Sequence, residues 1–217
     1  MAPNNEPING RNLLPALSVI FERLTREFDQ IPLERKHTLH ELTQFVQKRV
    51  ETKQSAYLNF ICTHNSRRSH LSQIWAQAAA FHYGIPGVVC FSGGTEATAF
   101  NPRAVKAMQE AGFNIKKTKE GDNPIYEVRF ADEAPAIIAF SKKYDDPVNH
   151  NDDFAAIMTC SHADDHCPLV LGASGRIALT YDDPKEFDGT SIESQKYLER
   201  AHQIGREILY AFSKVKS

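Results

Sequence analysis

Short apolar segments alternate with helical segments along most of this chain, and this alternation constrains its fold more than any other feature. Apolar runs predict strands at residues 57–61, 87–91, 154–158 and 176–181. Helices are predicted over 67–83 and from Pro102 to about Gly112. This order predicts an α/β fold with a mostly parallel sheet covered on both faces. The ligand site of such a sheet lies at the carboxyl ends of its strands.

Two regions interrupt this pattern. Residues 13–28 carry apolar side chains at helical spacing, and Pro32 suits the first turn of a second helix. Residues 1–54 are therefore predicted as a disordered start and a helical pair, an extension packed on a main domain of residues 55–217. Segments 125–130 and 136–140 form a possible inserted hairpin. The sequence Thr-Ser-Ile-Glu at 190–193 is a capping-box pattern that would start the last helix.

The composition argues against several classes of protein. The 217 residues are 41% hydrophobic and 24% charged, as in ordinary globular proteins, and the formal net charge of -2 disfavours a broad nucleic-acid or membrane-binding surface. No apolar run approaches the ~18 residues of a membrane-spanning helix, and the polar first residues lack the apolar stretch of a signal peptide. We therefore expect a cytoplasmic protein, whose cysteines are catalytic, metal-bound or inert rather than structural cross-links.

One cysteine, Cys62, directly follows the first predicted strand. A thiol attacks as a thiolate, so the loop after Cys62 has to stabilise a negative charge. The backbone N–H groups of residues 63–68 can converge on an anion, and the N-terminus of the next helix adds a positive partial charge. Arg68 can hold a tetrahedral oxyanion with two parallel hydrogen bonds, and the Ser69 hydroxyl can donate to the sulfur. The alternative is a buried cysteine at a strand end, with an arginine nearby by chance.

This arrangement predicts that Cys62 is a nucleophile at the base of an oxyanion-binding loop. Asn65 suits such a loop, because its short side chain can bridge backbone groups and tolerate a left-handed conformation. The residues expected to bind the oxyanion are Thr63, His64, Asn65, Ser66, Arg67, Arg68 and Ser69.

The segment from Asn59 to Ser69 resembles the low-molecular-weight protein tyrosine phosphatases and the thioredoxin-coupled arsenate reductases that share their fold. A second stretch, 92–104, is similar to the second loop and helix of that family, and the resemblance covers about 56–118 and 153–212. It implies a flavodoxin-like core of four parallel strands, with the N-terminal helical pair and the inserted hairpin as additions. It also implies a supporting role for Ser92 beside the loop.

A second pair of cysteines, Cys160 and Cys167, follows the buried strand at 154–158. Their Cys-x6-Cys spacing is similar to the redox pair of the arsenate reductases. The resemblance implies that Cys160 attacks Cys62 and that Cys167 then resolves the intermediate by thiol–disulfide exchange. Two other interpretations are a zinc site formed with His162 and His166, and two unrelated loop cysteines. Cys90, inside a predicted strand, is most simply an inert core residue.

The chemistry also needs a general acid. The sequence Asp-Asp-Pro occurs at 145–147 and again at 182–184. In the resembled family an Asp-Pro loop follows the last strand, which selects Asp183, while Asp146 is interpreted as part of a turn. Adjacent aromatic residues, usual in the phosphatases, are missing after Asp183, which suits a small inorganic substrate. The charged residues 142–143 are interpreted as a solvated edge rather than as part of the site.

Together these features predict an arsenate reductase that reduces arsenate to arsenite through a disulfide cascade. It would need no tightly bound cofactor and no metal, and would draw electrons from an external thioredoxin-like reductant. One alternative is a low-molecular-weight protein tyrosine phosphatase that hydrolyses phosphomonoesters through a cysteinyl-phosphate intermediate. Another is a non-catalytic oxyanion- or metal-binding regulator, against which the set of Cys62, Arg68 and Asp183 argues.

Overall fold

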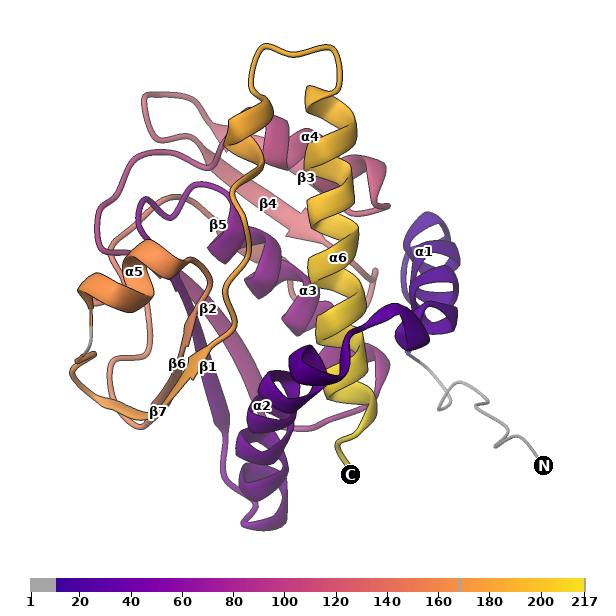
Figure 1. Ribbon diagram of the computed structural model, residues 1–217, viewed down its shortest axis with the longest axis vertical. Coiled ribbons are helices and arrows are strands. Elements are labelled where there is room, and N and C mark those ends of the chain that lie inside the picture. Colours follow the sequence, from indigo (N-terminus) through magenta and orange to yellow (C-terminus); the bar gives the residue numbers. More distant parts are fainter. Residues whose placement is uncertain (1–10, 168, 217) are drawn as a thin grey trace.

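Four parallel strands form the central sheet of the computed structural model, which describes residues 11–167 and 169–216 (Figure 1). The strand order is β2-β1-β6-β7. The register pairs Leu58 of β1 with Cys90 of β2 on one side and with Ala155 of β6 on the other. This confirms the predicted parallel core. The strands are β1 (Ala56–Cys62), β2 (Val88–Gly94), β6 (Phe154–Met158) and β7 (Ala173–Ala178).

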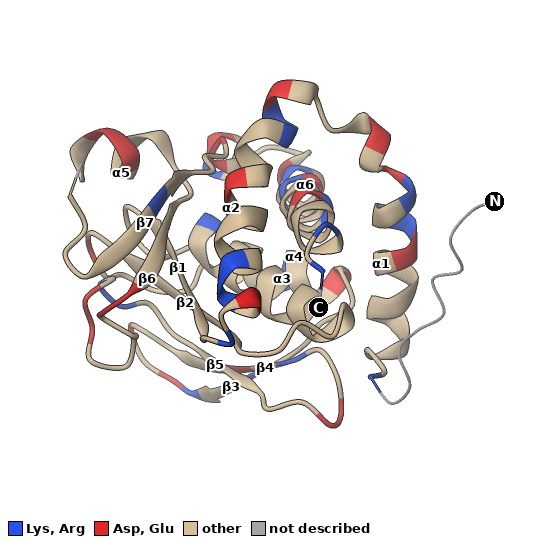
Figure 2. Cartoon of the chain, turned by 90° about the horizontal axis from the view of Figure 1, so that it is seen from below, with Lys and Arg blue, Asp and Glu red and all other residues tan. Residues whose placement is uncertain are grey.

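Alternate side chains of the central strands enter two different apolar clusters. Leu58, Phe60 and Ile157 face the main core, which is covered by the helices α2 (Leu33–Glu51), α3 (Arg68–His82) and α6 (Glu193–Ser213). Ile61 and Met158 face a smaller cluster under the short helix α5 (Ser161–His166). Because β1, β2 and β6 carry no charged residue, they are uniformly tan in Figure 2.

The predicted N-terminal helical pair is present and packs on the last helix. It consists of α1 (Pro15–Arg26) and α2, joined by the 3-10 turn η1 (Phe28–Gln30). Phe21 of α1 and Leu42 of α2 are buried in the same core as α6. The pair therefore completes the main core. Residues 1–10, where a disordered start is predicted, lie outside the described residues.

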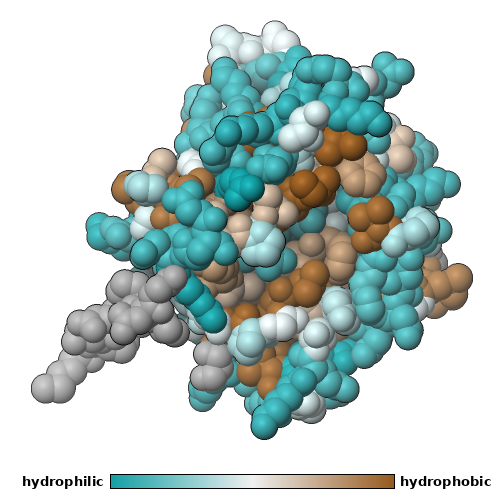
Figure 3. Space-filling model, turned by 180° about the vertical axis from the view of Figure 1, so that it is seen from behind, coloured by the Kyte–Doolittle hydropathy of each residue, from teal (hydrophilic) through white to brown (hydrophobic). Residues whose placement is uncertain are grey.

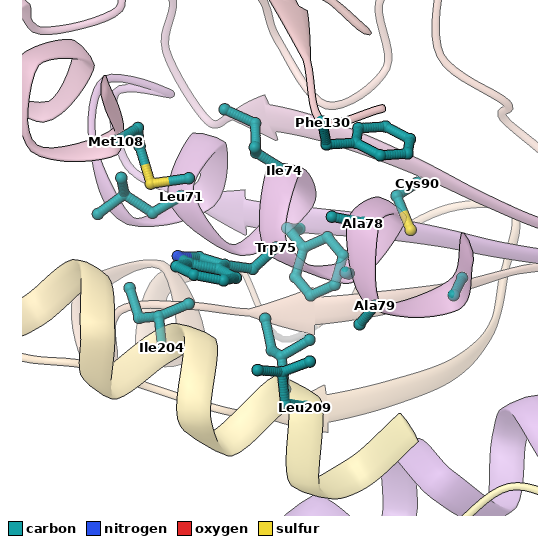
Figure 4. Packing of buried hydrophobic residues seen from close by; sticks show 14 of the residues in the cluster. Leu71, Ile74, Trp75, Ala78, Ala79, Cys90, Met108, Phe130, Ile204 and Leu209 are labelled. Carbon is teal, nitrogen blue, oxygen red and sulfur yellow. The ribbon is translucent and has the colours of Figure 1, made fainter. Parts of the chain in front are cut away.

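Trp75 of α3 is the largest fully buried side chain of the described residues, and it sets how closely α6 approaches α3 (Figure 4). Its ring makes an edge contact with Phe113, at 5.0 Å between centroids. Gly205 of α6 lies against the same indole, where a Cβ atom would stand only 2.7 Å from Cε2. The glycine is thus required by the packing of the two helices.

A second, antiparallel sheet contains the predicted hairpin. It comprises β3 (Asn114–Lys119), β4 (Ile125–Arg129) and β5 (Ile137–Ala139), in that order. β3 was not predicted, because Ile115 is its only buried residue and the others are exposed lysines and polar residues. The alternation of buried and exposed residues that indicates a strand is therefore missing. β3 follows α4 (Pro102–Glu110), whose N-cap Asn101 accepts a hydrogen bond from the backbone of Arg103 (2.9 Å).

The segment after β5 returns to the central sheet, and here one expectation is wrong. The backbone N of Gly94 donates to the carbonyl of Lys142, and Tyr144 N donates to the Gly94 carbonyl, both over 2.9 Å. Lys142 is therefore 4% exposed instead of lying at a solvated edge. Lys143, next to it, is exposed as predicted.

The outer edge of β2 is closed by side chains from α3. Gln77 donates to the carbonyl of Val88 (3.2 Å) and accepts from the backbone N of Cys90 (2.9 Å). Gln73 donates to the carbonyl of Cys90 (3.0 Å). Backbone groups that face away from β1 are thus satisfied without another strand.

The start of α6 differs from the predicted capping box. Ile192 is the N-cap and has no side-chain capping bond. The Thr190 hydroxyl donates backwards to the carbonyl of Phe187 (2.7 Å), and Glu193 accepts from the backbone of Gly189 (2.7 Å). The 3-10 helix η2 (Pro184–Phe187) directly precedes this turn, so the Thr190 hydroxyl bonds to the end of η2 instead of capping α6. None of the described helices is both long enough and apolar enough to cross a membrane.

Candidate active site

The Cys62 loop joins the end of β1 to the start of α3 at Arg68. Asn65 at its centre has a φ of 42°, in the left-handed region that asparagine tolerates. Its amide donates to the Ser69 hydroxyl (2.9 Å), which lies 3.1 Å from the Cys62 sulfur. Since Ser69 already accepts from Asn65, its own proton is available to the sulfur. The predicted stabilisation of negative charge on Cys62 therefore has a structural basis.

Neighbouring segments hold this loop in place. The side-chain oxygen Oδ1 of Asn65 accepts from the backbone N of Lys142 (2.9 Å). The carbonyls of Cys62 and Thr63 accept from the backbone of the loop after β2, at 3.1 and 2.8 Å. Gly94 makes this possible, because a Cβ there would stand 2.7 Å from the backbone N of Asn65. The loop is thus fixed by β2 on one side and by the insertion on the other.

Asp183, far away in sequence, lies directly over the loop. Arg68 donates to its carboxylate (2.8 Å) and to the carbonyl of Tyr181 (2.9 Å). Arg67 binds both carboxylate oxygens of the same residue. A narrow pocket between these groups is lined by Cys62, His64, Ser66, Arg67, Arg68 and Asp183. The structure therefore brings the predicted nucleophile, arginine and acid together.

The other candidate acid lies elsewhere. The carboxylate of Asp146 accepts from the backbone N of Val148 (2.9 Å), within its own turn. This matches the interpretation of the first Asp-Asp-Pro sequence as a turn.

The two arginines control the charge of Asp183. Burial of the carboxyl group raises its pKa, but the positive charges of Arg68 and Arg67 outweigh this effect and lower the pKa below the usual value. Asp183 is therefore ionised in this arrangement. An oxyanion that binds Arg68 would compete with Asp183 for the same guanidinium group.

The second cysteine pair brackets α5. Cys160 is fully buried at the N-cap, where its sulfur accepts from the backbone N of Ala163 (3.4 Å), and Cys167 is the partly exposed C-cap. The hydroxyl of Thr63, in the Cys62 loop, lies 3.5 Å from the Cys160 sulfur. Cys62 and Cys160 belong to one apolar cluster, and the partly buried Cys167 packs against it. Cys62 and Cys160 thus lie at the carboxyl ends of β1 and β6, with Cys167 at the other end of α5.

The zinc interpretation gains no support from the geometry. The rings of His162 and His166 stack at 4.2 Å between centroids, and His166 Nδ1 lies 2.8 Å from the carbonyl of His162. Within residues 11–167 and 169–216, no group of three or more His, Cys, Asp or Glu side chains is arranged to hold a metal ion.

Ser92 stands behind the loop rather than in contact with Cys62. Its hydroxyl lies 3.3 Å from Nδ1 of the buried His70, whose ring stacks on Phe100. Burial, followed by the positive charge of Lys142, lowers the pKa of His70 well below its usual value, so its ring is neutral. Ser92 therefore contributes through the packing of α3 against β2.

Sequence reasoning missed Arg176, which holds α5 from β7. Its guanidinium binds the Asp164 carboxylate (2.6 Å) and the Asp164 carbonyl (2.7 Å). An isolated arginine in a predicted strand gives no signal of such a role. The pairing of Arg67 with Asp183 was missed for the same reason.

Known proteins resemble most of this chain. The model of the family described as low molecular weight phosphotyrosine protein phosphatase matches residues 57–163. An arsenate reductase of Bacillus licheniformis is 33% identical over 150 residues, which cover 69% of this chain and 89% of the relative. The arsenate reductase of Shouchella clausii is 31% identical over the same shares.

Solved structures align as well. A low molecular weight phosphotyrosine phosphatase from Vibrio cholerae aligns with a TM-score of 0.48 at 14% identity, over 73% of this chain and 95% of the other.

Proposed function

The chain belongs to the low-molecular-weight phosphotyrosine protein phosphatase family, and we propose that within this family it is an arsenate reductase. The observation that carries the proposal is that Cys62 and Cys160 share one apolar cluster beside the anion loop and that Cys167 packs against this cluster. Hydrolysis of a phosphoester needs only the first of these thiols. Reduction of arsenic needs a second thiol to supply the electrons and a third to resolve the product.

In the first step, the Cys62 thiolate attacks the arsenic atom of arsenate, which is held by the loop amides and Arg68. A sulfur–arsenic bond forms, and a hydroxyl group of the arsenate takes a proton from Asp183 and leaves as water. This requires Arg68 to turn from Asp183 to the oxyanion. The departure of that cation raises the pKa of Asp183, so binding of the substrate itself prepares the acid.

In the second step, the Cys160 thiolate attacks the Cys62 sulfur. A Cys62–Cys160 disulfide forms while the electron pair of the sulfur–arsenic bond passes to arsenic, which leaves as arsenite. Cys167 then attacks the Cys160 sulfur, forms a Cys160–Cys167 disulfide and frees the Cys62 thiolate. The thiols supply both electrons, and an external dithiol restores them.

The last exchange requires α5 to unwind. Helical rise places the Cα atoms of residues seven positions apart about 10 Å from each other. A disulfide needs Cα atoms within about 7 Å. Unwinding is feasible because a helix of six residues is marginal on its own and depends on contacts such as that of Arg176 with Asp164.

We further propose that a thioredoxin-like protein reduces the final disulfide. Cys167 is the more accessible of the two sulfurs, and it lies beside Leu169 and Leu171, which are 72% and 75% exposed. Apolar side chains around an accessible sulfur suit docking of a reductant. Thiols that must be reduced after every turnover fit a reducing compartment such as the cytoplasm.

The second candidate is a phosphatase in which Cys160 protects Cys62 from overoxidation by forming a disulfide with it. The observation that favours it is the pocket itself, since the loop, Arg68 and Asp183 suit phosphate as well as arsenate. Some phosphatase activity is expected under either function.

The deciding experiment measures thioredoxin-coupled NADPH oxidation with arsenate beside hydrolysis of an aryl phosphate. Cys62→Ser should abolish both activities. Cys160→Ser should abolish arsenate reduction and keep most of the hydrolysis. Cys167→Ser should turn over once and stall as a Cys62–Cys160 disulfide, which mass spectrometry of peptides can identify.

Cys90→Ala, a change at a buried cysteine outside the site, is the matched control and should keep both activities. Full arsenate turnover in both Cys160→Ser and Cys167→Ser would contradict the reductase and leave the phosphatase.

A further inference from the structure

A second pocket, of about 610 Å³, opens between the C-terminal half of α3, the outer side of β2 and the residues around β5. Figure 3 shows hydrophobic residues gathered in a hollow on the face of the molecule opposite to that of Figure 1. The pocket shares no lining residue with the pocket around Cys62. Its volume lies within the range of roughly 300–1,000 Å³ that is typical of small-molecule sites. It can therefore be considered as a site in its own right.

The walls of this second pocket are apolar. Phe81, Ile85, Phe130 and Ile137 line it. At its rim, Ile138 is 51% exposed and therefore in contact with solvent instead of the core. Such walls favour a hydrocarbon or aromatic ligand.

Two positively charged residues line this apolar space, the exposed Arg11 and the buried Lys142. Lys142 lines the pocket and is 4% exposed, and no carboxylate forms an ion pair with it among the described residues. Its ammonium group lies over the ring of Phe140, at 4.7 Å from the centroid. Burial lowers the pKa of Lys142 to about 8, against the opposing effect of Asp146. A buried ammonium without an anion is costly, and a negatively charged ligand would relieve that cost.

Two further polar atoms belong to residues of the same pocket. The side-chain carbonyl oxygens of Gln73 and Asn149 are buried and accept no hydrogen bond from the described residues. Unsatisfied buried acceptors are uncommon in folded proteins. As acceptors they call for a hydrogen-bond donor, which a hydroxyl or amine group on the body of a ligand would supply and its anionic head would not.

We propose that this pocket binds a small organic acid, with its anionic head on the ammonium group of Lys142 and its aromatic or aliphatic body against Phe81, Phe130 and Ile137. The site is independent of the reaction at Cys62, so the proposal stands whether the chain reduces arsenate or hydrolyses phosphoesters. It is specific in its chemistry: the head must be an anion, and the body must be apolar.

Two fluorescent molecules test the two parts separately. 8-Anilinonaphthalene-1-sulfonate has an apolar body and an anionic head, and N-phenyl-1-naphthylamine has the same body without the charge. Both should bind the folded chain with a saturable rise in fluorescence, and decanoate should displace the sulfonate. Lys142→Met should lower the affinity for the sulfonate by about tenfold or more, because one good ionic contact is lost. The affinity for the neutral molecule should change by no more than about twofold.

Lys142→Met keeps the backbone N–H that binds Asn65, so the Cys62 loop retains its support. Lys143→Met, at the exposed neighbour, is the matched control and should change neither affinity. Ala136→Trp places a large side chain in the pocket and should abolish binding of both molecules, with circular dichroism to verify the fold.

Equal affinity of the sulfonate for Lys142→Met and for the unchanged chain would overturn the proposal. So would continued binding of both molecules to folded Ala136→Trp, since they would then bind elsewhere.

Discussion

The guanidinium group of Arg67 binds both carboxylate oxygens of Asp183, at 2.8 Å from Nε to Oδ1 and at 3.2 Å from Nη2 to Oδ2. Arg68 binds the second of these oxygens as well, at 2.8 Å. The proposed acid thus lies between two cations in the anion-free state. It can hold a proton only after at least one of them has turned away.

Loss of Arg67 should shift the pH dependence of catalysis. Arg67 lowers the pKa of Asp183, so Arg67→Ala raises it. A general acid works while protonated, and its rate limb falls as the pH rises through its pKa. The basic limb of the kcat profile for aryl phosphate hydrolysis should therefore move to higher pH in Arg67→Ala. Arg200→Ala, which removes the partner of the neighbouring Asp182, should leave the limb unchanged.

Asp183→Asn should slow both arsenate reduction and aryl phosphate hydrolysis, because it removes the proton donor from each. General-acid assistance is worth roughly 10²- to 10⁴-fold, and steady-state kinetics at saturating substrate measures the loss. Asp146→Asn is the control, since Asp146 serves its own turn. A large loss in Asp146→Asn with normal rates in Asp183→Asn would show that the wrong Asp-Pro sequence was assigned.

Arg176→Gln should speed up formation of the Cys160–Cys167 disulfide. Arg176 binds the side chain and the carbonyl of Asp164, so its removal loosens α5. Rapid quenching with mass spectrometry should show a faster second exchange, and hydrogen exchange over 161–167 should accelerate. Arg129→Gln, which breaks a pair with Glu127 on β4, is the matched control. An unchanged exchange rate over α5 would mean that Arg176 does not restrain it.

Gly205→Ala should destabilise the protein although alanine favours helices by about 1 kcal/mol over glycine. The new Cβ would stand 2.7 Å from the Trp75 ring, and overpacking of a core costs about 1–3 kcal/mol. Trp75 is the sole tryptophan, so urea unfolding followed by its fluorescence reports on this contact. Ser194→Ala, on the exposed part of α6, should leave the unfolding free energy nearly unchanged.

Lys142 should make stability rise with pH. Its pKa is lowered to about 8 in the folded chain, against the ordinary value of 10.5. Between these values the unfolded chain binds more protons, so the unfolding free energy rises with pH. Over this pH range, the unfolding free energy of the unchanged chain should rise relative to that of Lys142→Met by on the order of 3 kcal/mol.

Three other titratable groups lie near Lys142. Asp146 raises the pKa of Lys142, His70 on α3 is neutral, and Arg11 lines the same pocket. Urea unfolding from pH 7 to 10.5 measures the effect, with Lys143→Met as control. A difference that stays constant with pH would contradict the burial of the charge.

Much of the fold could be predicted because its strands are short apolar runs. β6 has the predicted bounds, and β1 runs straight into Cys62 as expected. β7 lies at Ala173–Ala178 rather than at 176–181, because its first three residues are small, are not buried and form no apolar run. β3 was missed since most of its side chains face solvent, and the alternation that indicates a strand is weak there.

The candidate site likewise has a part that the sequence predicts and a part that it does not. The order of residues along one loop predicted Cys62, Arg68 and Ser69, since their roles depend on local geometry. The contact of Arg67 with Asp183 spans 116 positions and depends on how β7 and η2 return to the loop. The burial of Lys142 likewise depends on the insertion packing against β2. Such long-range relationships leave no periodic pattern in the sequence.

The closed outer edge of β2 bears on how the protein behaves when crowded. An open edge strand is a template on which a second chain can add a strand, and this is a common start of aggregation. Here Gln77 and Gln73 already bond Val88 and Cys90, so an incoming strand would have to displace them. Gln77→Ala would free two backbone groups of β2 and thereby favour the addition of a strand from a second copy of the chain. The two glutamines thus disfavour self-association along this edge.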